Sequence, residues 1–106
     1  MANKHLVLII DTATSDSTRV AVDIDGQRVE KTADLNQKKS QAVLPLILKL
    51  ISENKLDFKD VSAISVNPGP GSFTGLRVGL AVANMLGKLL DIPVNGQRDI
   101  VLPRYV

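Results

Sequence analysis

Eleven residues, Asn67–Arg77, decide how this chain folds; they read Asn-Pro-Gly-Pro-Gly-Ser-Phe-Thr-Gly-Leu-Arg. An alternating apolar run, Val61–Val66, precedes them, and an amphipathic run typical of a helix follows from about Leu76. Glycine can adopt positive φ, whereas proline fixes φ near −65° and biases the preceding residue toward extended backbone. The segment therefore predicts a sharp corner between a strand and a helix.

The same corner carries the polar side chains Ser72, Thr74 and Arg77, close to where a helix presents free N–H groups. No Lys-Ser or Lys-Thr pair follows the glycines, so the segment is not a P-loop, and it is not a G-x-G-x-x-G motif. A nucleophilic Ser72 would need a nearby base, and the only histidine, His5, precedes the first strand. The residue pattern favours a structural corner most, an anion-binding loop second and a catalytic loop least.

Composition narrows the class of protein. A chain of 106 residues is predicted to be one domain, 1–106, and its 44% apolar but 3% aromatic content indicates an aliphatic core. Few exposed rings argue against binding single-stranded nucleic acid by base stacking. The formal charge of +2 permits weak contact with RNA, for which Lys38 and Lys39 are minor candidates. No cysteine is present, which excludes disulfides, thiolate catalysis and cysteine zinc sites.

The N-terminus lacks the pattern of a signal peptide, and no apolar run approaches the length that spans a membrane. We therefore expect a cytoplasmic protein without membrane contact.

Periodicity predicts an α/β domain with the element order β-β-β-α-β-α-β and helices packed on a mixed sheet. Asp25-Gly26 is a strong hairpin turn signal, and Ser40 is the expected N-cap of the first helix. The expected strands are Leu6–Ile10, a run containing Val20, Val22 and Ile24, Arg28–Ala33, Val61–Val66 and a fifth from Pro93, with helices at Gln41–Glu53 and Leu76–Leu90. Gly96–Val106 has no clear period and is expected to be a short element or a loose tail.

Asp11 follows the first strand and precedes a loop rich in hydroxyl side chains. A carboxylate there could hold Mg²⁺ and nucleotide phosphates, with Ser72 and Thr74 as further candidates for cofactor binding. The loop after Asp11 has no glycine, which close backbone approach to phosphate would favour. A capped polar loop is thus the preferred interpretation, and no catalytic residue or metal site is predicted.

Small residues recur every four positions in the second helix, at Gly75, Gly79, Ala83 and Gly87. Glycine inside a helix costs about 1 kcal/mol relative to alanine, so such a stripe suggests a compensating close contact. That contact is either with the domain's own helix and sheet or with a helix of another protein. The first helix is apolar nearly all round and should be covered on more than one side. The residues leave both alternatives open.

The glycine-rich corner, continued as Gly69–Gly79, resembles the TsaB (YeaZ) family of tRNA threonylcarbamoyladenosine biosynthesis proteins, within the glycoprotease-like group. The opening Ile9–Thr14 and the helical stretch Ser40–Ile47 carry the same resemblance. The resemblance implies an actin-like, ribonuclease-H-like fold. It covers the N-terminal half of the usual family member, so the second subdomain is absent, and Lys39 stands where the family usually has His.

The resemblance implies a non-catalytic partner of the TsaD transferase, in a complex that includes the TsaE ATPase and meets tRNA indirectly. Pairing, as a homodimer or with a TsaD-like protein, would use the two helices. The residues expected at that interface are Leu44, Ile47, Leu48, Ile51, Arg77, Gly79, Leu80, Ala83 and Gly87. The alternative is a nucleotide-binding, actin-like domain with its own ATPase or transferase activity. Only that alternative requires ATP and Mg²⁺.

Overall fold

The computed structural model describes residues 5–14, 17–33 and 39–105. Its strands are β1 (Leu6–Asp11), β2 (Thr18–Ile24), β3 (Gln27–Ala33) and β4 (Val61–Val66). Its helices are α1 (Lys39–Glu53), the short 3₁₀ helix η1 (Phe58–Asp60) and α2 (Phe73–Leu90). Lys38 lies outside the described residues.

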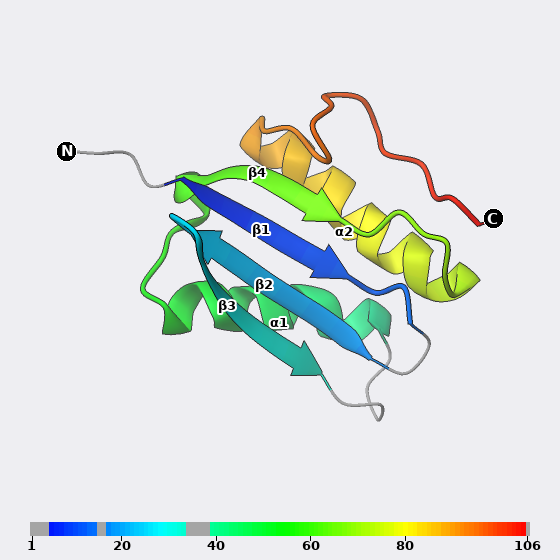
Figure 1. Cartoon of the computed structure of the whole chain (residues 1–106), viewed down its shortest axis with the longest axis horizontal. Helices are drawn as coiled ribbons and strands as arrows, with labels where there is room; N and C mark the ends of the chain where they lie inside the picture. The colour runs from blue at the N-terminus through cyan, green and yellow to red at the C-terminus, as the bar shows by residue number, and fades with distance from the viewer. Residues whose placement is uncertain (1–4, 15–16, 34–38, 106) are drawn as a thin grey trace.

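The strands form one mixed sheet in the order β3-β2-β1-β4 (Figure 1). β1 pairs antiparallel with β2 and parallel with β4, and β2 pairs antiparallel with β3. The hairpin between β2 and β3 turns at Asp25 and Gly26, which both adopt positive φ as a tight two-residue turn requires. The mixed sheet, its hairpin and the order of its first six main elements confirm the sequence prediction.

The predicted fifth strand is wrong in extent. Val94 makes only isolated bridges, parallel to Ile64 and antiparallel to Gln97. The chain turns back directly after Val94 because Asn95 and Gly96 both have positive φ. A tight reversal replaces the strand that Pro93 was expected to start.

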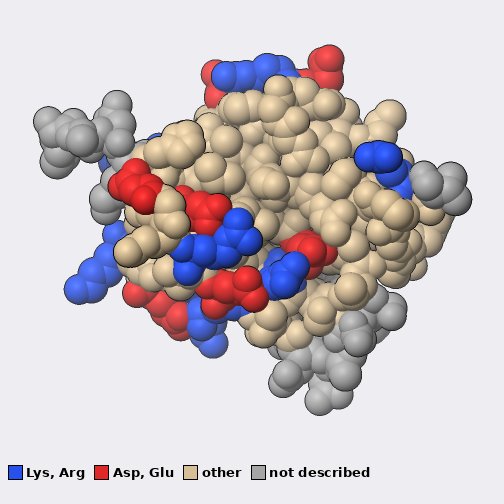
Figure 2. Space-filling view, viewed as in Figure 1, with Lys and Arg blue, Asp and Glu red and all other residues tan. Residues whose placement is uncertain are grey.

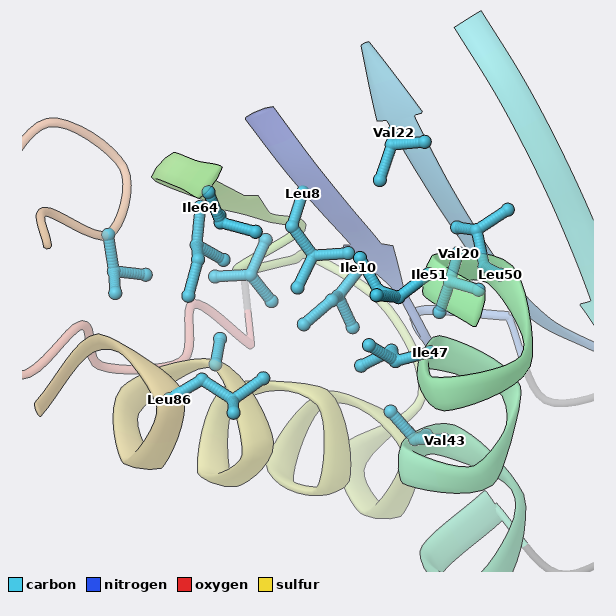
Figure 3. Packing of buried hydrophobic residues seen from close by; sticks show 14 of the residues in the cluster. Leu8, Ile10, Val20, Val22, Val43, Ile47, Leu50, Ile51, Ile64 and Leu86 are labelled. Carbon is cyan, nitrogen blue, oxygen red and sulfur yellow. The ribbon is translucent and has the colours of Figure 1, made fainter. Parts of the chain in front are cut away.

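Both helices cover the same face of the sheet, and the core lies between them and the strands (Figure 3). Along β1, Leu8 and Ile10 are fully buried and point toward the helices, whereas the intervening Ile9 is only partly buried. Ile47 of α1 and Leu86 of α2 pack against these strand residues in the same core cluster. The core is aliphatic, as the composition predicted.

The helix boundaries differ from the predicted ones at their N-termini. α1 starts at Lys39, so Ser40 lies inside the helix and is not its N-cap. α2 starts at Phe73, three residues before the predicted start, because the Ser72 hydroxyl caps it by accepting a hydrogen bond from the Gly75 N–H at 3.3 Å. α2 ends at Leu90, as predicted, and its C-cap Asp91 adopts the left-handed conformation.

The face of the sheet opposite the helices carries several charged side chains beside the partly buried Val7 and Ile9 of β1. Figure 2 shows acidic and basic side chains gathered over the strands on this face. Arg19 pairs with Asp11 at 3.1 Å, and Arg28 pairs with Asp23 at 2.8 Å, each across neighbouring strands. Hydrogen bonds and attraction from Arg28 lower the pKa of the Asp23 carboxyl, although partial burial opposes them.

The C-terminal segment, residues 98–105, runs back alongside α2 (Figure 1). Asn84 of α2 exchanges two hydrogen bonds, each 3.0 Å, with the backbone of Val101, which is buried. Farther along, the Arg104 N–H donates to the Pro68 carbonyl at 2.6 Å. The segment predicted as a short element or loose tail is an ordered extended stretch fixed to the helix.

By length and composition, α2 could cross a membrane, with a mean hydropathy of 1.2 over its 18 residues. This differs from the expectation that no apolar run approaches that length. A core helix passes the same test, however, and seven residues of α2 are buried in the domain.

Candidate interaction surface

The glycine-rich corner is held by its own backbone and by the loop after β1. The Gly69 N–H donates to the Asn67 side chain at 3.0 Å, and the Ser72 N–H donates to the Ala13 carbonyl at 2.7 Å. A Cβ on Gly71 would lie 2.6 Å from the same Ala13 oxygen, so only glycine fits there. Because these donors are used internally, the geometry supports a structural corner.

Asp11 is likewise engaged within the fold. One carboxylate oxygen accepts hydrogen bonds from the Ala13 N–H at 3.0 Å and the Asn67 amide at 3.3 Å, and the other accepts from Arg19 at 3.1 Å. Among the described residues, no hydrogen bond joins Asp11 to Ser72 or Thr74. The three candidates for nucleotide binding, Asp11, Ser72 and Thr74, thus lie near one end of the sheet. Asp11 uses its carboxylate there to cap a polar loop.

The described residues contain no group of three or more His, Asp or Glu side chains that could hold a metal ion. His5 is exposed at the start of β1, and its backbone bonds to the Asp25 side chain. Ser72 uses its hydroxyl as a helix cap. No described side chain stands near Ser72 in the arrangement that nucleophilic catalysis requires.

The small-residue stripe of α2 makes its close contacts within the chain. A Cβ on Gly79 would collide with the hydroxyl of Thr12, and one on Gly87 would lie 2.5 Å from a Val94 methyl. Thr12 is itself buried and donates a hydrogen bond to the Gly75 carbonyl at 2.5 Å. The stripe therefore allows α2 to pack on the loop after β1 and on the bridge residue Val94.

Six residues expected at a protein interface lie in this domain's own core. They are Ile47, Ile51, Gly79, Leu80, Ala83 and Gly87. Of the remaining three, Leu44 is partly buried, Leu48 is 50% exposed and Arg77 is exposed. Of the nine expected residues, only Leu44, Leu48 and Arg77 are therefore at least partly accessible to a partner.

We call the sides of α1 and α2 that face away from the sheet the outer helical surface. On α2, a shallow groove of about 470 Å³ is lined by Phe73, Thr74, Arg77, Val78, Ala81 and Val82. On α1, a second groove of about 630 Å³ is lined by Ala42, Pro45, Leu46, Leu48, Lys49 and Ser52. α1, which was expected to be covered on more than one side, packs on the sheet and on α2 and leaves the side that carries Leu48 and Lys49 exposed.

Exposed apolar side chains concentrate around α2. Eight large hydrophobic residues of the described chain are exposed, and six of them lie on α2 or the C-terminal segment: Phe73, Met85, Leu89, Ile100, Leu102 and Tyr105. The Phe73 ring stacks on Tyr105 with centroids 4.7 Å apart, and the Arg77 guanidinium lies 5.4 Å from the Phe73 centroid. A surface this rich in exposed apolar side chains is typical of a protein interaction site.

A second apolar row of α2, beside the glycine stripe, was not predicted from the sequence. The signal was present in the sequence: Val78, Val82, Met85 and Leu89 recur at helical spacing and form this row. An all-apolar helix has two candidate faces, and only the packing shows that the glycine side is the buried one.

The comparisons with known proteins agree with this architecture. The sequence model of the TsaD family, tRNA N6-adenosine threonylcarbamoyltransferase, matches residues 33–97. The chain belongs to the TsaB/YeaZ family, within the TsaD group. It is 34% identical over 86% of its length to a TsaB of Buchnera aphidicola, and 31% identical over 85% to TsaB of Escherichia coli. Both relatives are described as tRNA threonylcarbamoyladenosine biosynthesis proteins.

A solved YeaZ structure from Pseudomonas aeruginosa superposes with a TM-score of 0.78 at 30% identity over 85% of this chain. This likeness confirms the predicted actin-like, ribonuclease-H-like fold class. The chain spans 43% and 38% of the two TsaB relatives and 41% of the YeaZ chain. It therefore corresponds to less than half of each.

Proposed function

We propose that this chain is a non-catalytic binding component of the machinery that makes threonylcarbamoyladenosine in tRNA. In this role it pairs, through the outer helical surface, with a TsaD-like transferase or with a second copy of itself. A TsaE-like ATPase would belong to the same complex, and tRNA would be met through the partner.

One observation carries the proposal. The match to the TsaD family model, residues 33–97, spans the whole of α1, β4 and α2. These elements also carry the outer helical surface, so a TsaD protein would have a homologous pair of helices. Two homologous chains can then pair about an approximate two-fold axis, with equivalent surfaces facing one another, as in isologous contacts.

The exposure pattern supports the choice of residues. Leu48 on α1 and Met85 on α2 are 50% and 42% exposed, and each belongs to a helix whose opposite side is in the core. Burying such side chains against a partner removes apolar area from water at roughly 25 cal/mol per Å². These two positions can change to a charge without disturbing the core.

The function can be tested in Escherichia coli depleted of TsaB, by mass spectrometry of nucleosides from digested tRNA. Expression of this chain should restore threonylcarbamoyladenosine, and the double variant Leu48→Glu, Met85→Glu should not. Val29→Glu is the matched control, because Val29 is also exposed but lies on β3. The proposal fails if the double variant restores the nucleoside as well as wild type does. It also fails if wild type restores none.

A further inference from the structure

The two edges of the sheet end differently. Along β4, the Asn95 side chain bonds to both backbone groups of Val66. β3 forms the other edge (Figure 1), and no strand of the described residues pairs with its outer side. Five of its seven residues, Gln27–Glu30 and Thr32, are exposed. Such an edge is a template for pairing with a strand of another chain.

The hairpin fixes which backbone groups of β3 point outward. Because two residues close the hairpin, Gln27 exchanges hydrogen bonds with β2, and every second residue after it does the same. The N–H and carbonyl groups of the intervening Arg28, Glu30 and Thr32 therefore point away from β2. These groups are the ones that a further strand would bond.

Charges along β3 select one way for two copies to pair. Outward groups of two antiparallel copies meet only when the two-fold axis passes beside a residue, which then faces its own copy. With the axis at Arg28, Glu30 or Lys31, like charges would meet there, and like charges destabilise a cross-strand pair. With the axis at Val29, two valines meet, each 37% exposed in the single chain. Arg28 of each copy then lies opposite Glu30 of the other.

Charged residues on an edge strand often prevent pairing altogether. In β3, however, both cations are already neutralised within the chain: Arg28 pairs with Asp23 at 2.8 Å, and Lys31 pairs with Glu53 at 2.7 Å. Glu30 forms no ion pair with any other described residue. Pairing centred on Val29 would give this carboxylate a guanidinium directly opposite, so the charges exclude the other registers and favour this one.

We propose that β3 pairs antiparallel with β3 of a second copy, centred on Val29, so that the two sheets join into one. Both helices of each copy then cover the same face of the joined sheet, because the two-fold axis is perpendicular to it. The outer helical surface stays accessible in this arrangement. The inference goes beyond the tRNA role proposed above and does not depend on it.

Single cysteines can test this register, because the chain has no cysteine of its own. In the proposed pair, the two Val29 Cα atoms face each other at about 4.5 Å, within the range of a disulfide. Under mild oxidation, Val29→Cys should form at least about fivefold more disulfide dimer on a non-reducing gel than Thr32→Cys, whose copies lie roughly 20 Å apart along the strands. Glu30→Cys, which reports the neighbouring register, should also stay low.

Sedimentation equilibrium tests the charges. Wild type should dimerise, and Glu30→Lys should weaken the dimer at least about tenfold, because each Arg28 then faces a cation. Val29→Glu should also yield monomers, since it places two carboxylates on the axis. Met85→Glu on α2 should leave the dimer intact.

A monomeric wild type would overturn the inference, and so would a dimer that Met85→Glu dissociates and Glu30→Lys does not. Cross-linking of Val29→Cys no greater than that of Thr32→Cys or Glu30→Cys would overturn it as well. The proposed tRNA function would survive any of these results, because it is judged separately by the threonylcarbamoyladenosine measured in cells.

Discussion

Gly79 shows how a single residue sets the position of α2. Its missing side chain leaves room for the buried hydroxyl of Thr12, which bonds to the Gly75 carbonyl one turn earlier. The helix thus approaches the loop after β1 more closely than any larger residue would permit. From the sequence, the need for a close contact at Gly79 could be predicted, but its partner could not, because Thr12 is 67 positions away in the chain.

Gly79→Ala should therefore lower the free energy of unfolding by up to about 2 kcal/mol. Overpacking costs typically 1–3 kcal/mol, and the better helix propensity of alanine returns roughly 1 kcal/mol. Urea denaturation would measure the change. In a double-mutant cycle, Thr12→Ala should offset part of the loss because it removes the obstructing hydroxyl. A Gly79→Ala protein more stable than wild type would contradict this packing.

Asp23 and Arg28 make the charged face of the sheet sensitive to acid. Arg28 lowers the pKa of the Asp23 carboxyl, mainly by its hydrogen bonds. A lowered native pKa means that the stabilisation is present above the unfolded pKa and is lost as pH falls through the folded pKa. Arg28→Ala should raise the Asp23 pKa toward its ordinary value in an NMR titration of the carboxyl carbon, whereas Arg19→Ala should not. An unchanged midpoint in Arg28→Ala would show that the pair does not form in solution.

At the scale of elements, the sequence patterns predicted six main elements in their correct order, but the fifth strand expected after α2 is reduced to the isolated bridges of Val94. Strand and helix periods depend on local side-chain patterns, so β1 to α2 could be predicted from them. Whether a strand continues beyond Val94 depends instead on Asn95 and Gly96, which both have positive φ. The uncovered side of α2 is a tertiary property as well, because it depends on which of two apolar faces meets the sheet.

Asn95 also closes the free edge of β4. Its side-chain amide donates to the Val66 carbonyl at 2.9 Å and accepts from the Val66 N–H at 2.8 Å. The backbone of Asn95 donates to Ile64 at 2.9 Å. A side chain thus takes the hydrogen bonds that a fifth strand would make at Val66.

Asn95→Gly should expose this edge while keeping the positive φ that the turn requires. We expect a loss of about 1 kcal/mol of unfolding free energy, with faster amide exchange at Val66, because two backbone groups lose their partner. Asn95→Asp retains the acceptor oxygen, so the Val66 amide should exchange more slowly in Asn95→Asp than in Asn95→Gly. Unchanged exchange at Val66 in Asn95→Gly would rule out the edge-closing role.

At the scale of the whole molecule, the two faces of the sheet differ in what they can bind. One carries ion pairs among the strands (Figure 2). The other is covered by the two helices (Figure 1), whose outer sides carry exposed apolar side chains such as Leu48, Met85 and Leu89. The chain spans less than half of its TsaB relatives. The part of the chain that matches the TsaD family model, residues 33–97, includes α1 and α2, the helices that carry the outer helical surface.

The most direct test of this account is the affinity of the purified chain for a bacterial TsaD protein, measured by titration calorimetry. Wild type and the Val29→Glu control should bind alike. Leu48→Glu and Met85→Glu should each weaken binding by about 30-fold or more, as expected when a hot-spot side chain worth roughly 2 kcal/mol is lost. Equal affinity of all four proteins, or no binding by wild type, would contradict the claim that α1 and α2 form the docking surface.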